Sequence, residues 1–475
     1  MDRRRLLLLT AAALSGAGCT TDPRTPDIAQ LYEGVSLVDP ALRRPMVTVP
    51  GLLGSRLRLG RDGPFVWGGD RRLSIDPFKG RNVQILSLPI GQGGEALSAL
   101  RDEIRHDGVL RKARASVLIG TLEEQVYDGL VQALNLGGYE FSRTVAEEEA
   151  RSGENPGSLE YPYDWRRDIV EAAQGLDLFI ERKAEQIERV RRERYGNSLD
   201  AATMRFDFVA HSMGTLVLRY WLMYGAQDLP ADASLPELTW AGARRAHSVV
   251  FMAPPNLGSI SAFDGLVMGK TFGPLQPYYP PALLATHHSL YQLLPRERHK
   301  RVRVGGPDGP SPGPLFEAET WAANRWGLFD PEADAVLDRA LGTAGGTATR
   351  ETRLMDYTAR VLDRAHRLQN ALDVGGSAPD VDSYLVVGTG LDTPATAVLE
   401  PDTRRIQALL DEEGDGVVLR ASALMSESQG GYIPSLRGRR MRYRTTLLLP
   451  GEHVDLTSSP VFADNLLYWL GDTPA

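Results

Sequence analysis

Cysteine is almost absent from this chain, which has one, Cys19, among 475 residues. A disulfide needs two cysteines, so the chain cannot form one within itself, and no cysteine nucleophile is available after residue 19. Histidine, aspartate and glutamate also show no cluster with metal-ligand spacing. The sequence therefore predicts a protein without a metal or other cofactor.

Lysine is scarce as well, with 5 residues among the 53 basic ones, and the arginines are scattered rather than clustered. The net charge is -8 and the sequence pI is near 5.6. This distribution offers no basic face, so nucleic acid is not predicted as a partner. After residue 20 no apolar run approaches membrane-spanning length, so no internal transmembrane helix is predicted either.

The N-terminus differs in kind from the rest. Arg3 to Arg5 precede an apolar run at 6–14, and small residues lead to Cys19, which is the pattern of an export signal. It resembles a bacterial lipoprotein signal, although Gly16 stands where that pattern usually has Leu. Residues 1–19 are thus expected to be a signal with anchor Cys19, and the polar segment 20–44 a tether. The alternative is ordinary signal cleavage nearby with an incidental cysteine. The anchored interpretation places the protein in the bacterial cell envelope, with a membrane surface as partner.

Residues 205–224 read RFDFVAHSMGTLVLRYWLMY, an apolar strand-like run, a short turn and a run with helical spacing. This context fits a nucleophile elbow with Ser212 at its tip. The sharp turn leaves room only for small side chains two residues away on either side, and Ala210 and Gly214 meet that requirement. The following helix would offer its positive N-terminal end to developing negative charge.

The rest of the chain alternates strand and helix patterns, which predicts a mostly parallel sheet with flanking helices in one domain, 45–475. At 120–136 Leu122, Val126, Leu130 and Leu134 recur four apart, which predicts an amphipathic helix. A long helix is expected over 168–195. Further expected elements are strands at 45–50, 248–253, 383–388 and 443–449 and a helix at 460–470.

The segment at about 260–378 interrupts this alternation with proline- and glycine-rich stretches. We expect it to be an insertion that forms a cap or lid over the carboxyl edge of the sheet. It contains Trp321, Trp326 and Phe329. These aromatic residues either form the core of the cap or expose a lipid-facing patch.

A serine nucleophile needs a base and a carboxylate, which follow it in the order acid, then histidine, after an elbow of this type. His453 is the histidine that follows the last expected strand, so it is the candidate base. Asp415, between two glycines at 414 and 416, is the best candidate acid. Open alternatives for the acid are a weaker turn residue, Asp392, and neighbours that also fit a solvated acidic face, Asp411, Glu412 and Glu413.

An oxyanion hole would use one N–H from the residue after the nucleophile and another from the loop after the first strand. The first is Met213. For the second, Leu52 in the segment VPGLLGS at 49–55 is the first choice and Leu53 the second.

Seven segments in order then resemble the lecithin:cholesterol acyltransferase family, which includes lysosomal phospholipase A2 and has an α/β-hydrolase fold. They are VPGLLGS at 49–55, GGY at 137–139, PYDWR at 162–166, AHSMG at 210–214, VVGTGLDTP at 386–394, GDGVV at 414–418 and GEHVDL at 451–456.

The resemblance implies acyl transfer from a phospholipid or similar lipid ester through an acyl-enzyme on Ser212, with His453 and Asp415 completing the triad. Asp164, Trp165 and Arg166 would support the site without reacting. The acceptor, water or an alcohol, stays open. Two alternatives are an esterase for soluble esters and an envelope lipoprotein whose elbow is vestigial.

Overall fold

The computed structural model describes residues 43–69, 83–117, 120–125, 127–139, 157–196, 200–232, 234–271, 277–342, 348–374, 376–426 and 441–471. Cys19 and residues 20–42 of the expected tether lie outside these ranges. Among the described residues, no helix is both long and apolar enough to span a membrane.

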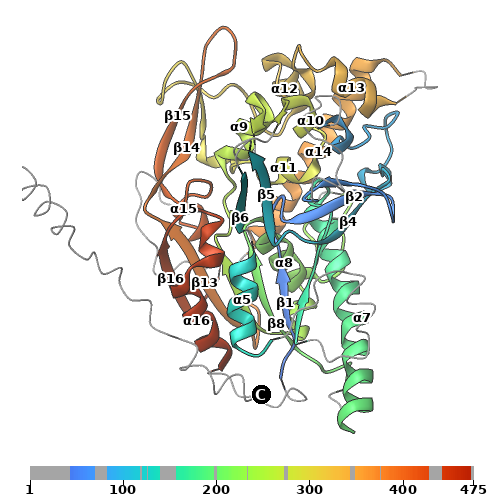
Figure 1. Cartoon of the computed structure of the whole chain (residues 1–475). Coiled ribbons are helices and arrows are strands. Elements are labelled where there is room, and N and C mark those ends of the chain that lie inside the picture. The colour runs from blue at the N-terminus through green and yellow to red at the C-terminus, as the bar shows by residue number, and fades with distance from the viewer. Residues whose placement is uncertain are drawn as a thin grey trace, which may run out of the picture.

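A six-stranded sheet forms the centre of the molecule, and all its neighbouring strands are parallel (Figure 1). Along its four inner strands almost every residue is buried, on both faces of the sheet, as expected for a parallel sheet between two helical layers. Its strands, in spatial order, are β16 (Thr445–Pro450), β13 (Asp382–Thr389), β9 (Ala246–Met252), β8 (Phe206–His211), β1 (Met46–Val49) and β7 (Ser158–Glu160).

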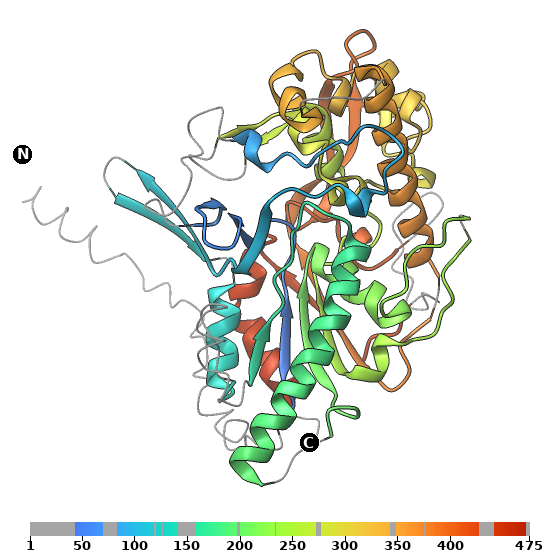
Figure 2. The same ribbon diagram turned by 90° about the vertical axis from the view of Figure 1, so that its right-hand side faces the viewer.

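Two helical layers cover the sheet. Leu385 and Val387 of β13 join the core formed with α7 (Ile169–Tyr195) and α8 (Met213–Tyr224). Their neighbours Tyr384 and Val386 face a second core, formed with α5 (Asp128–Leu136) and α16 (Pro460–Gly471). Figure 2 shows α7 on one side and the pair α5 and α16 on the other. The predicted parallel sheet with flanking helices is confirmed.

The segment expected as a cap forms a layer of helices beyond the carboxyl ends of the strands (Figure 1). Trp321 and Trp326 are almost fully buried there, so they belong to the core of this layer and not to an exposed patch. The elements are α9 (Ile260–Met268), β10 (Lys270–Thr271), β11 (Tyr278–Tyr279), α10 (Pro281–Leu284), α11 (His288–Gln292), α12 (Ala318–Asn324), α13 (Asp334–Leu341) and α14 (Arg350–Leu372).

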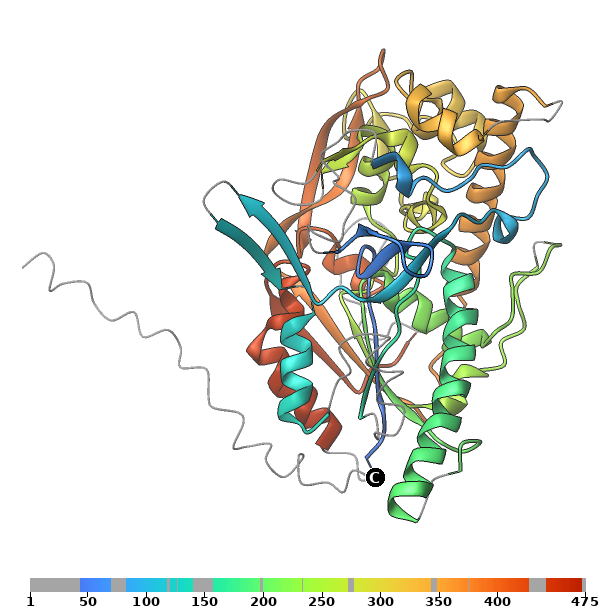
Figure 3. The same ribbon diagram turned by 45° about the vertical axis from the view of Figure 1, so that its right-hand side comes forward.

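The helix predicted over 120–136 is wrong in its first half. Residues Gly120–Gln125 form strand β6, which pairs in antiparallel fashion with β5 (Lys112–Val117), and the helix begins only at Asp128. Pairing with the strand just before it along the chain overrides the four-residue apolar spacing. The β5–β6 hairpin stands away from the body in Figures 2 and 3.

Two small sheets and the short helix α15 (Arg420–Ala423) are further elements of the structure. The first contains β3 (Phe65–Trp67), β2 (Ser55–Leu59) and β4 (Ile104–Val109), and the second β12 (Val302–Val304), β14 (Leu391–Leu399) and β15 (Ile406–Gly414). Short 3-10 turns are η1 (Gln84–Leu86), η2 (Leu97–Ala99), η3 (Gly242–Arg245), η4 (Glu297–His299), η5 (Gly327–Phe329) and η6 (Asp455–Ser458).

Candidate active site

Ser212 lies between the last residue of β8 and the first residue of α8, in a backbone conformation with φ 53° and ψ -128°. A positive φ is unusual for a residue with a side chain and marks a strained turn held by its surroundings. Gly214 packs so tightly that a Cβ there would lie 2.4 Å from the carbonyl oxygen of Pro50. The strand, strained serine and helix are the geometry of a nucleophile elbow.

Asp415 and His453 lie in contact although 38 positions separate them. Nδ1 of His453 is 2.8 Å from Oδ2 of Asp415, and both side chains are buried. The other carboxylate oxygen of Asp415 accepts the N–H groups of Val417 and Val418. The His453 N–H also donates to the Asp415 carbonyl oxygen at 3.0 Å. This arrangement fixes the orientation of the imidazole ring.

The electrostatics of Asp415 favour its ionised form. Burial by itself raises the pKa of this carboxyl, but the His453 ring and the two backbone N–H donors outweigh burial, so the pKa is lowered overall. An ionised carboxylate at His453 Nδ1 stabilises a proton there and leaves Nε2 free as a base. The opposite side of Asp415 is close to Gly388 of β13, where a Cβ would lie 2.4 Å from the Asp415 Cβ.

Ser212, Asp415 and His453 gather at the carboxyl edge of the sheet, at the ends of β8, β13 and β16. The ring of His211, the residue before Ser212, lies 4.7 Å from that of His453, centroid to centroid. Within the described part of the chain, Ser212 Oγ and His453 form no hydrogen bond. In enzymes without substrate such bonds are often long and shorten only in the reacting complex.

The loop after β1 lies directly against the nucleophile. A Cβ at Gly51 would be 2.7 Å from Ser212 Cβ, so only glycine fits. Two N–H groups of this loop already have acceptors. The Gly51 N–H donates to the Tyr127 hydroxyl, and the Gly54 N–H donates to the Gly51 carbonyl. In the described structure this leaves the N–H groups of Leu52 and Leu53 for another acceptor. Met213 is the first residue of α8, where N–H groups have no helical acceptor.

The PYDWR segment at 162–166 holds the loop after β1 in place through side-chain hydrogen bonds. The Tyr163 hydroxyl donates to the Pro50 carbonyl, and the Trp165 indole donates to the Ser55 carbonyl. Arg166 is completely buried and forms ion pairs with Asp164 and with Asp102. Burial alone would raise the pKa of Asp164, but Arg166 lowers it overall. The three residues predicted to support the site therefore lie beside it.

Sequence reasoning missed three residues here: Asp102, Tyr127 and His211. Asp102 lies in a stretch without a recognisable motif, so no sequence pattern points to it. Tyr127 was placed within a helix, whereas it precedes α5 and hydrogen-bonds Gly51. His211 precedes the nucleophile, so the expected order of serine, acid and histidine does not point to it, yet it contacts both Tyr127 and His453. Only its position beside Ser212 could have drawn attention to it.

The alternative acids lie elsewhere. Asp392 is exposed on β14, and Asp411, Glu412 and Glu413 are exposed on β15. Glu412 pairs with Arg301 and Glu413 with Arg420. No group of three or more His, Cys, Asp or Glu in the described residues could hold a metal ion.

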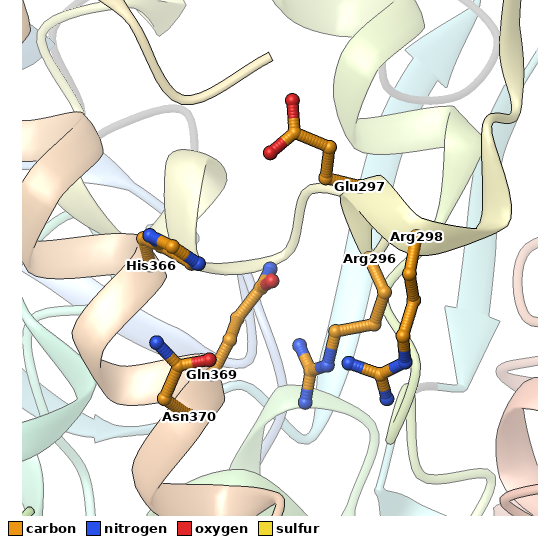
Figure 4. A pocket seen from close by; sticks show the side chains of 6 residues that line it. All are labelled: Arg296, Glu297, Arg298, His366, Gln369 and Asn370. Carbon is orange, nitrogen blue, oxygen red and sulfur yellow. The ribbon is translucent and has the colours of Figure 1, made fainter. Parts of the chain in front are cut away.

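A separate pocket of about 330 Å³ opens between η4 and α14 (Figure 4). None of the predicted site residues lines it. Asp373 forms ion pairs with both arginines of its wall. The lining residues are Arg296, Glu297, Arg298, His366, Gln369 and Asn370.

Comparison with protein families adds evidence on the kind of protein to which this elbow belongs. Residues 123–302 match the lecithin:cholesterol acyltransferase family. The match contains the PYDWR and AHSMG segments, and it confirms the resemblance drawn from the motifs. It supports an enzyme that acts on lipid esters. Asp415 and His453 lie outside the matched residues. The hydrogen bond between them is therefore an observation that does not depend on the family match.

Solved structures match most of the chain at low sequence identity. The crystal structure of the Tle4-Tli4 complex contains a chain that is 15% identical, with a TM-score of 0.56 over 90% of this chain and 98% of that one. Lipase 1 from Pelosinus fermentans is 13% identical, with a TM-score of 0.32 over 91% and 100% of the two chains. Staphylococcus hyicus lipase is 11% identical, with a TM-score of 0.36 over 90% and 94%.

The likeness to the first of these structures is one of fold alone, and the two lower scores add nothing to it. With the parallel sheet and the elbow, the predicted α/β-hydrolase fold is confirmed. The search among curated proteins finds no match.

Proposed function

We propose that this protein transfers the acyl group of a phospholipid or similar lipid ester through an acyl-enzyme on Ser212. The supporting observation is the hydrogen-bonded pair of Asp415 and His453 at the sheet edge where the elbow lies. The family match supplies the substrate class, lipid esters. The geometry supplies the assignment of roles.

In the first half-reaction, Ser212 Oγ attacks the ester carbonyl and His453 Nε2 accepts the hydroxyl proton. The negative oxygen of the tetrahedral intermediate accepts the N–H groups of Met213 and Leu52. The C–O bond to the leaving alcohol then breaks, and His453 returns the proton to that alcohol. Asp415 keeps the imidazole oriented and stabilises its charge throughout.

In the second half-reaction, an acceptor hydroxyl attacks the acyl-enzyme while His453 takes its proton. The ester bond to Ser212 Oγ then breaks, and His453 returns the proton to Ser212. Water gives a free fatty acid, and an alcohol gives a new ester. The same residues serve both outcomes, so the acceptor depends on which hydroxyl reaches the acyl-enzyme in the closed site.

Phosphatidylcholine vesicles, with and without a sterol or long-chain alcohol, test the proposal. Free fatty acid as the sole product identifies a phospholipase, and sterol or alkyl ester identifies an acyltransferase. Either product must disappear in Ser212→Ala and His453→Ala. Persistent product in both variants, or wild-type protein that takes no label from a serine-reactive phosphonate, overturns the proposal. Cleavage of dispersed short esters with no gain on vesicles argues for a soluble esterase instead.

We also propose that the protein is exported and anchored in the bacterial envelope through a lipid on Cys19. The support is the sequence pattern of residues 1–19. Intact-mass measurement of membrane-extracted protein checks this, since a lipidated N-terminal cysteine adds a diacylglyceryl mass. Cleavage at another site, or an unmodified Cys19, contradicts it. Cys19→Ser should release the protein from the membrane fraction.

A further inference from the structure

Two buried side chains, Tyr127 and His211, connect the loop beside the nucleophile to the backbone of the candidate base. The Tyr127 hydroxyl lies 2.8 Å from the Gly51 nitrogen and 2.9 Å from Nδ1 of His211. Nε2 of His211 lies 3.0 Å from the carbonyl oxygen of His453. Tyr127 and His211 are both at most 5% exposed. The network thus runs from residue 51 through residue 211 to residue 453.

The partners allow one assignment of hydrogens when His211 is neutral. A carbonyl oxygen only accepts, so Nε2 of His211 must hold the proton that is donated to His453. Nδ1 is then bare and accepts the Tyr127 O–H, while the tyrosine oxygen accepts the Gly51 N–H. The neutral state is favoured because burial, helped by His453, lowers the pKa of His211 to about 3. Every polar atom of the network is satisfied in this arrangement.

The two ends of the network belong to strands that are far apart in the sheet. Gly51 follows β1 and His453 follows β16, and three strands, β8, β9 and β13, lie between these two. Neither loop can therefore be held in place by the other through strand pairing. His211, at the end of the intervening β8, bridges them.

We propose that Tyr127 and His211 are positioning residues that set the oxyanion loop and the base relative to Ser212. The proposal rests on the function proposed above. Because the Gly51 N–H is used by Tyr127, the next N–H groups along the loop are left for the oxyanion. Because the His453 carbonyl is held by His211, the imidazole of His453 is fixed from its backbone as well as from Asp415.

Tyr127→Phe removes only the hydroxyl and is the main test. We expect kcat for a short-chain ester to fall about 10- to 100-fold with KM within about twofold, because donors misplaced by less than 1 Å act mainly on the transition state. Tyr224→Phe is the matched control. It removes another buried hydroxyl, bonded to the Ala371 carbonyl at the far end of α8, and should leave kcat unchanged.

The two variants together separate an effect on positioning, which appears in kcat, from an effect on stability, which appears in Tm. Tyr127→Phe loses two buried hydrogen bonds and Tyr224→Phe loses one, so Tm should fall in both variants and somewhat further in Tyr127→Phe. A kcat for Tyr127→Phe within twofold of that for Tyr224→Phe would overturn the proposal.

His211→Gln and His211→Leu give a rescue test. Glutamine has an N–H donor for the His453 carbonyl and an acceptor for the Tyr127 hydroxyl, whereas leucine has neither. We expect the glutamine variant to keep at least tenfold more kcat than the leucine variant. Equal losses in the two variants would show that His211 acts through its volume and would contradict the proposal.

Nitrogen-15 NMR of histidine-labelled protein tests the network without turnover. At pH 7 the His211 ring should show a protonated Nε2 and a bare, hydrogen-bonded Nδ1, and the Nδ1 resonance should shift in Tyr127→Phe. A protonated Nδ1, or no shift in the variant, overturns the proposal even in active enzyme. Wild type that shows the expected spectrum without turnover or phosphonate labelling would instead refute the proposed function.

Discussion

The two halves of the candidate site are held in place by different means. The half that contains Ser212 and the loop at 50–55 depends on close packing and on hydrogen bonds to main-chain carbonyls from Tyr163 and Trp165. The half that contains Asp415 and His453 depends on a charged carboxylate, which accepts three hydrogen bonds. The first half should therefore be sensitive to added volume, and the second to lost charge.

The largest effect is expected from loss of charge in the second half. Asp415→Asn keeps the shape of the side chain but favours the wrong tautomer of His453, and by analogy with serine proteases kcat should fall by about 10⁴-fold. Steady-state kinetics on a short-chain ester measures this. Asp392→Asn, at the exposed alternative acid, is the control and should match wild type. Activity retained in Asp415→Asn but lost in Asp392→Asn would reverse the assignment.

Added volume in the first half should produce the next largest effect. Gly51→Ala places a methyl group 2.7 Å from Ser212 Cβ and 3.1 Å from the His211 carbonyl oxygen. One of these backbones must move, and we expect kcat to fall by about 10²-fold, the size seen when an oxyanion donor is lost. Gly306→Ala, where a Cβ would meet nothing within 4 Å, should have no effect. Equal activity of the two alanine variants would show that the loop adapts freely.

His288, a buried histidine outside the candidate site, is expected to make the stability of the protein depend on pH. Burial, followed by the Arg167 charge, lowers the pKa of His288 to about 3, and both its ring nitrogens lack a partner in the described structure. In the unfolded chain its pKa is about 6.5. Between these values only the unfolded chain binds the proton, so this residue makes stability fall as the pH falls below about 6.5.

His288→Leu should remove that contribution. Urea unfolding at pH 7.5 and 5.0 should show a smaller loss of stability on acidification than in wild type, by about 1.4 kcal/mol per pH unit below about pH 6.5. The difference between variant and wild type should stay constant between pH 7.5 and 8.5. Parallel stability curves below pH 6 would show that His288 is protonated in the folded protein.

The smallest effect is expected from a single supporting hydrogen bond of the first half. Tyr163→Phe removes the bond to the Pro50 carbonyl and should cost about 1 kcal/mol of stability and a few-fold in kcat. Tyr161→Phe, at the stacked neighbour whose hydroxyl donates to the Ala172 carbonyl, should cost similar stability but no activity. Thermal unfolding and kinetics of both variants make the comparison. Equal kcat losses would assign the effect to packing.

The two halves of the candidate site also differ in how far the sequence could predict them. The elbow at Ser212 was predictable because strand, turn and helix are contiguous. Asp415 and His453 were found from their order along the chain and their glycine-containing loops, although only the structure shows them in contact. The contacts of Asp102 with Arg166 and of Tyr127 with Gly51 join segments more than 60 residues apart, and nothing local marks them.

The β14–β15 hairpin was not predicted for a related reason. Its second strand contains an acidic run at 411–413, which suggests a solvated face or alternative acids and not a strand. These residues are indeed exposed, but pairing with β14 makes them a strand edge. Exposure on a paired edge strand and exposure in a loop look alike in a single sequence.

Ser259 has a consequence for any exchange of the helical layer above the sheet. Its hydroxyl accepts the Ser261 N–H at the start of α9 and donates to the Val417 carbonyl, two residues from Asp415. Ser422 makes a second connection, from its hydroxyl to the Gly258 carbonyl. A hinge placed before residue 259 would drag the carboxylate along with the moving helices. Chimeras that graft a foreign lid should therefore join the chains after Ile260.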